Sequence, residues 1–227
     1  MSRSKHTRPR HVLAASRVRA PYEPRGSQDR SLERRVARAF KEDGILLESP
    51  ALPLAQEAPL PRIVVQPPRA GHCHPASKAA IEELLRFFGP ACYYGLRRIE
   101  LVQGNHRDDR LVFGRLVVPG RIILYDQRPS PWTIAGALTA DQLEVLCRAG
   151  ALPETTTAGL HMTVVWPGET LRDFLRFDVL MHEIGHHMIQ QYKGKRTLRV
   201  ARSKDHEQWA DAFAYRCRCV YQKAVAG

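Results

Sequence analysis

The stretch VLMHEIGHHM, residues 179–188, contains the pattern His-Glu-x-x-His. On a helix, His182 and His186 lie one above the other on the same face, because they are four residues apart. Two imidazole nitrogens at that spacing can bind one Zn²⁺ ion. Glu183 points close to the same face and can reach a water activated by the ion, but not the ion itself. The stretch therefore predicts a buried helix that carries a metal site.

A second stretch, DHEQWADAFAY at residues 205–215, supplies candidates for the third protein ligand that a catalytic zinc requires. Glu207 and Asp211 are again four residues apart. Glu207 can ligate zinc from a facing helix, and Asp211 can accept the other ring N–H of a ligating histidine and so fix its tautomer. His206 is the alternative third ligand and would indicate a three-histidine site.

Taken together, HEIGH at residues 182–186 and EQWADAFA at residues 207–214 resemble the gluzincin metallopeptidases, and are most similar to the compact ImmA/IrrE-like branch. The resemblance covers residues 96–221 and is specific only at the two helical motifs. It implies Glu183 as the catalytic base and Asp211 as the hydrogen-bond partner of a ligand. It implies three zinc ligands: His182, His186 and Glu207.

The resemblance favours Glu207 over His206, because Asp211 stands at the right offset from Glu207. It implies a cytoplasmic, zinc-dependent endopeptidase that cuts an intracellular protein, often a single regulatory one. In that mechanism Glu183 takes the proton of the attacking water and passes it to the leaving nitrogen. Three residues are candidate donors to the oxyanion: Tyr192, Tyr215 and His187.

Two other functions remain open on the residues alone. The first is a nucleic-acid-associated regulatory protein in which the zinc site is structural or vestigial. Structural zinc has four protein ligands, so a fourth ligand such as His187 or His206 would indicate this function. The second is a zinc hydrolase that acts on a non-peptide amide.

The charge of the chain is concentrated near its N-terminus. The 227 residues carry a net charge of +12, and residues 1–41 hold twelve Lys and Arg against three acids. We expect residues 1–75 to form a basic, Pro-rich, largely disordered arm and linker, and residues 76–227 to form the folded domain. The arm and the acid-free basic segment 193–204 can contact nucleic acid or an acidic substrate.

The remaining composition points to a cytoplasmic protein. The five cysteines are odd in number and irregularly spaced, and no secretory signal is present, so we expect reduced thiols. No run of eighteen apolar residues exists, so we expect no membrane partner.

The order of the expected helices and strands predicts an α+β fold with a small antiparallel or mixed sheet. The resemblance to gluzincins implies that two of the helices form a zincin-like pair that binds the metal. Helices are expected from residue 77, from residue 139, over residues 170–193 and from about residue 204 to 223. Strands are expected near residues 98–102, 111–118 and 121–126, arranged as an antiparallel meander, and at residues 161–166. The last strand is expected to be an exposed edge that binds substrate as an added strand, with 121–126 as the alternative.

Overall fold

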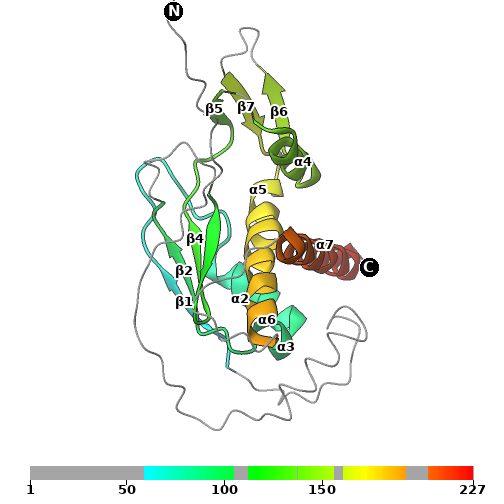
Figure 1. The fold of residues 1–227 in the computed structure, drawn as a ribbon. Helices are drawn as coiled ribbons and strands as arrows, with labels where there is room; N and C mark the ends of the chain where they lie inside the picture. Colours follow the sequence, from blue (N-terminus) through cyan, green and yellow to red (C-terminus); the bar gives the residue numbers. More distant parts are fainter. Residues whose placement is uncertain (1–58, 105–111, 137, 156–160, 193–203, 227) are drawn as a thin grey trace, which may run out of the picture.

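The computed structural model describes residues 59–104, 112–136, 138–155, 161–192 and 204–226. Within these residues the chain is α+β, as expected, with two small sheets and helices that lie along one side of the larger sheet (Figure 1). No described helix has both the length and the apolar character needed to cross a membrane.

The larger sheet has four strands in the order β1-β2-β4-β3. β1 pairs with β2 and β2 with β4 in parallel, whereas β3 and β4 form an antiparallel pair. Side chains alternate across the strands, so one face carries the apolar positions that meet the helices. The strand bounds are β1 Arg62–Val65, β2 Arg98–Val102, β3 Gly114–Val117 and β4 Arg121–Tyr125.

The expected meander is wrong in its pairing, although its strands exist. β4 inserts between β2 and β3, and Ile99 of β2 stands opposite Ile122 of β4 in parallel register. Alternation of apolar residues identifies a strand and its buried face, but it carries no information about which strand lies beside it. The tight connection at Gly120, which has a positive φ of 62°, does join β3 to β4 as a hairpin.

The expected linker is also wrong in part. β1 lies inside the Pro-rich stretch and forms an edge of the sheet, so the folded body begins before residue 76. The segment after β1 is also bonded to the end of β4. Asp126 accepts hydrogen bonds from the backbone and guanidinium of Arg69 and from the backbone of Gly104. Residues 1–58 lie outside the described residues, as does the segment 193–203.

The smaller sheet is antiparallel, in the order β5-β7-β6. The expected strand at residues 161–166 is its central strand, whereas β5 and β6 were not expected. Beside this sheet lies α4, the helix expected from residue 139, which begins with a capping box formed by Thr139 and Gln142. The bounds are β5 Trp132–Ala135, α4 Ala140–Arg148, β6 Leu152–Thr155 and β7 His161–Val165.

The remaining helices pack around one long helical run. The first of them, α2, begins at the Ser77 cap, as expected, and ends before Gly89, and the short α3 follows it. The long run then consists of α5, a π-helical segment η1 and α6, and α7 packs beside it. The bounds are α2 Lys78–Phe88, α3 Pro90–Tyr93, α5 Thr170–Asp173, η1 Phe174–Met181, α6 His182–Tyr192 and α7 Lys204–Ala226.

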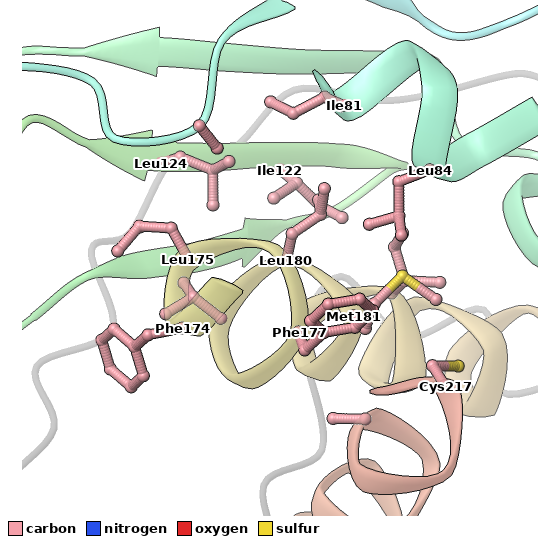
Figure 2. Packing of buried hydrophobic residues seen from close by; sticks show 14 of the residues in the cluster. Ile81, Leu84, Ile122, Leu124, Phe174, Leu175, Phe177, Leu180, Met181 and Cys217 are labelled. Atoms are coloured by element: carbon pink, nitrogen blue, oxygen red, sulfur yellow. The ribbon is translucent and has the colours of Figure 1, made fainter. Parts of the chain in front are cut away.

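η1 lies in the middle of the core (Figure 2). Seven of its eight residues are buried, and all are apolar except Arg176 and Asp178, which is the composition of a helix that lies inside a core. Ile122 and Leu124 of β4 face it from the sheet, Leu84 of α2 faces it from above, and Cys217 belongs to α7 below (Figure 2). η1 therefore holds α6 between the sheet and α7.

An aromatic cluster joins the two sheets to the start of η1. Phe174 packs edge-on against Phe113, with ring centroids 4.8 Å apart, and its ring is tilted against that of Trp166, with centroids 5.0 Å apart. Trp132 completes the cluster by contacting Phe113 and Trp166. The cluster fixes the N-terminal end of the run that leads into the histidine pair.

Candidate metal centre

α6 presents the two histidines from its first turns. His182 is its first residue and His186 follows one turn later, with the two ring centroids 4.7 Å apart. His186 is almost fully buried and the side chain of His182 is 15% exposed. The Nε2 atoms lie 3.0 Å apart, so both point at the same place in space.

Glu207 reaches that place from the first turns of α7. Its Oε2 atom lies 3.2 Å from His186 Nε2 and 3.3 Å from His182 Nε2. Around a tetrahedral Zn²⁺ with bonds of about 2.0–2.1 Å, neighbouring ligand atoms stand about 3.3–3.4 Å apart. The three atoms therefore already have nearly the spacing that one zinc ion requires, and they are the only His, Cys, Asp or Glu cluster of this kind among the described residues.

Asp211 lies behind His182, as its spacing predicts. Its Oδ1 accepts a hydrogen bond of 2.8 Å from His182 Nδ1, which leaves Nε2 directed at Glu207. Burial alone would lower the pKa of His182, but the hydrogen bonds to Asp211 and Glu207 outweigh it and raise the pKa to about 9. A divalent cation would compete with a proton for this cluster of negative charge.

Glu183 is held outside the three-atom group. Its side chain is buried, with 4% of the residue exposed, and its Oε2 accepts a 2.7 Å hydrogen bond from the backbone N–H of Leu116 in β3. This contact joins residues far apart in sequence, so no local pattern signalled it. It fixes the orientation of the carboxylate beside the histidine pair, where Glu183 also helps to raise the pKa of His182.

A glycine sets the separation of the two helices at the site. Gly185 lies between the two histidines, and a Cβ built on it would stand 3.1 Å from Ala210 Cα and 3.3 Å from Ala210 Cβ. Ala210 itself is fully buried. The small residues let α6 and α7 approach closely enough for Glu207 to reach the histidines.

The structure separates the other candidates from the three-atom group. His206 is described but is not a member of it. His187 is buried and its Nε2 donates to the carbonyl of Tyr94 at 2.9 Å, so this nitrogen is engaged away from the ligands. Tyr215 is 54% exposed on α7, and the side chain of Tyr192 lies outside the described residues.

The two strands expected to present a free edge do not do so. β4 lies between β2 and β3, and β7 lies between β5 and β6, so both are central strands. The edge strand that contacts α6 is β3. β7 leads directly into the helical run that carries the histidines, but this does not make it an edge strand, because edge position depends on the pairing of the whole sheet.

The backbone N–H and C=O groups of successive β3 residues point alternately toward β4 and toward the outer edge of the sheet. Tyr125 N–H donates to Phe113 C=O, so the backbone groups of alternate residues from Phe113 face β4. Those of Gly114 and Leu116 face outward, and Leu116 N–H makes its bond to Glu183 there. The outer edge of β3 thus runs beside the carboxylate.

Comparison with known proteins yields no assignment: no protein-family model, no curated protein and no solved structure matches this chain.

Proposed function

We propose that this chain is a zinc-dependent hydrolase that cleaves peptide bonds in a protein substrate, with an arrangement like that of the compact gluzincins. The observation that carries the proposal is the convergence of His182 Nε2, His186 Nε2 and Glu207 Oε2 within 3.0–3.3 Å of one another. Three lone-pair atoms at that spacing repel one another unless a cation or a proton lies among them. The donor set of two imidazoles and one carboxylate suits Zn²⁺.

The chain's own groups fit hydrolysis at such an ion. When bound, Zn²⁺ lowers the pKa of a water and polarises the carbonyl to be attacked. Glu183 is oriented by Leu116 and takes the proton of the attacking water, then delivers it to the leaving nitrogen. Asp211 keeps His182 in the tautomer that ligates through Nε2.

A peptide substrate is favoured over other amides by the position of β3. The Leu116 N–H at the outer edge is bonded to Glu183, so a substrate would pair with the outward groups of Gly114 and the carbonyl of Leu116, next to that carboxylate. An extended peptide that pairs with this edge would carry its own carbonyls past the carboxylate and the histidine pair. A small amide would gain nothing from an adjoining strand edge.

An active-site zinc is favoured over a structural one by the number of ligands. Structural zinc is enclosed by four protein ligands, whereas three candidate ligands gather in the described part of the chain. The basic arm and the segment 193–203, which motivated nucleic-acid binding, lie outside the described residues. The catalytic function is therefore the one that the described residues support.

The direct test compares wild type with Glu183→Gln on a peptide library made from a digested proteome. Mass spectrometry reads the new peptide termini, and metal analysis reads the bound zinc. We expect the variant to retain zinc and to produce none of the cleavages of wild type, because the amide cannot accept the proton of the water. Equal cleavage by both proteins, or none by zinc-loaded wild type, contradicts the proposal.

The ligand assignment has its own matched pair of variants. Glu207→Ala should lose zinc, because two imidazoles alone hold the ion weakly. His206→Ala changes the preceding residue and should keep zinc at the wild-type ratio. The reverse result would make His206 the third ligand.

A further inference from the structure

The contact between the long helical run and α7 contains a series of three polar pairs, which we call the polar ladder. Its pairs are Asp178–Arg218, His182–Asp211 and His186–Glu207. The first members are four residues apart, and the second members fall on one face of α7, so the helices run antiparallel along the ladder. The second and third pairs belong to the proposed metal centre, whereas the first does not.

Arg218 is a buried arginine that contacts several elements at once. Its Nη2 makes an ion pair with Asp178 of η1 and lies 3.4 Å from the carbonyl of Asp173. Its Nη1 lies 3.4 Å from the carbonyl of Arg148 at the end of α4. The guanidinium also stands over the ring of Phe177, 5.6 Å from the centroid. One side chain of α7 is thus tied to both η1 and α4.

Burial and the neighbouring charges act in opposite directions on the pKa of Asp178. Burial raises the pKa of Asp178 to about 6, against the attraction of Arg218 and Arg148, and the nearby carboxylate of Asp211 adds to the rise. Removing a carboxylate and a guanidinium from water is costly, so a buried pair of this kind adds little to stability compared with apolar residues. Its best-attested use is to specify the register of packed elements.

The metal centre requires that register. Each residue advances a helix by about 1.5 Å, whereas metal–ligand distances hold within about 0.2 Å. The other buried residues of α7 near the centre are small or apolar, such as Ala210, Ala214 and Phe213, and their packing is not directional. Arg218 lies seven residues from Asp211, about 10 Å along the helix, so it cannot touch the ion.

We propose that Arg218 is a positioning residue of the metal centre: by pairing with Asp178 it fixes the axial register of α7, and hence the place of Glu207 and Asp211. The inference rests on the proposed zinc site. It assigns a role to a pair of residues that neither helical motif includes.

The test replaces the pair by apolar residues of similar size. Asp178→Leu/Arg218→Met leaves no lone buried charge, so the double variant should melt at or above the wild-type temperature. Its Zn²⁺ affinity, measured by competition with a chromogenic chelator on the folded protein, should nevertheless fall tenfold or more. Arg218→Lys keeps the ion pair but loses the planar set of guanidinium donors, so its Zn²⁺ affinity should lie between those of wild type and the double variant.

A control is the ion pair of the half-buried Arg69 with the buried Asp126, which lies away from α6 and α7. Arg69→Met should lower the melting temperature and leave the Zn²⁺ affinity of the folded protein unchanged. The absorption spectrum of Co²⁺-loaded protein provides a second reading, because it reports ligand geometry. It should change in the Asp178→Leu/Arg218→Met variant and not in Arg69→Met.

The outcomes separate the two proposals. Wild-type Zn²⁺ affinity and an unchanged Co²⁺ spectrum in the stable double variant would overturn the role of Arg218 and leave the zinc site standing. Failure of wild type itself to bind Zn²⁺ would overturn the site and the positioning role together.

Discussion

His182 illustrates how much of the centre depends on single contacts. Its Nδ1 is bound to Asp211 and its Nε2 points at Glu207 and His186. The His-Glu-x-x-His spacing predicts the two histidines together, because four residues span one helical turn. The same rule relates Asp211 to Glu207 on α7. At this scale the sequence is informative, since both regularities are local.

Replacing Gly185 by alanine adds one methyl group where α6 packs against α7. Gly185→Ala places a Cβ 3.1 Å from Ala210 Cα, so α7 must move outward by a few tenths of an ångström. We expect Zn²⁺ affinity to fall about tenfold or more, although alanine favours the helix itself. Chelator competition measures the affinity and circular dichroism the helix content. Unchanged affinity would show that the contact does not set the position of Glu207.

Asp126 is the residue whose charge should appear in the acid stability of the fold. Burial would raise its pKa, but hydrogen bonds from Arg69 and Gly104 lower the pKa to about 2. A carboxyl with a lowered folded pKa stabilises the protein above its unfolded pKa, here by about 2 kcal/mol, and this stabilisation disappears as the pH falls from about 4 to 2. Arg69→Met should therefore be less stable than wild type at pH 7, and the difference should shrink at pH 2.5.

Urea unfolding of both proteins at pH 7, 4 and 2.5 measures this difference. Because other carboxyl groups titrate equally in wild type and variant, their effects cancel in the comparison. A difference in unfolding free energy that is the same at every pH would contradict the role of the Asp126 charge.

At the scale of elements, β3 is the strand whose position carries a functional consequence. Its residues read as a strand in the sequence, yet its place at the edge beside α6 follows only from the parallel pairing of β2 with β4. The long helical run was likewise expected, but its π-helical segment was not, because an apolar sequence supports either kind of turn. Element identity is thus more predictable than element placement.

Strand addition at β3 predicts an alternating pattern in a cleaved peptide. In a paired strand, successive backbone N–H groups point to opposite sides. Methylating the amides one at a time should therefore abolish cleavage at alternate positions near the scissile bond and leave the intervening positions nearly unaffected. Digestion followed by mass spectrometry measures each rate. Equal effects at neighbouring positions would show that the peptide does not bind as an added strand.

At the scale of the whole molecule, the proposed ion would connect two helices that meet through tertiary contacts. A ligand bound only by the folded state stabilises it by about 2.7 kcal/mol at a concentration of 100 times Kd. For a domain of this size that corresponds to a rise in Tm of about 5–10 °C. Calorimetry with added Zn²⁺ should show the rise in wild type and its loss in His186→Ala. A zinc-induced rise of equal size in the variant would place the ion elsewhere.

The amino-acid sequence determined the residues of the candidate site and the helices that carry them, because helical spacing and capping depend on neighbours within a few positions. Tertiary structure decided which groups meet. It brings Glu207 rather than His206 to the histidines, bonds Glu183 to the edge of β3, and pairs Arg218 with Asp178. These contacts join residues separated by tens of positions, so they depend on strand order and helix packing, which no local periodicity specifies.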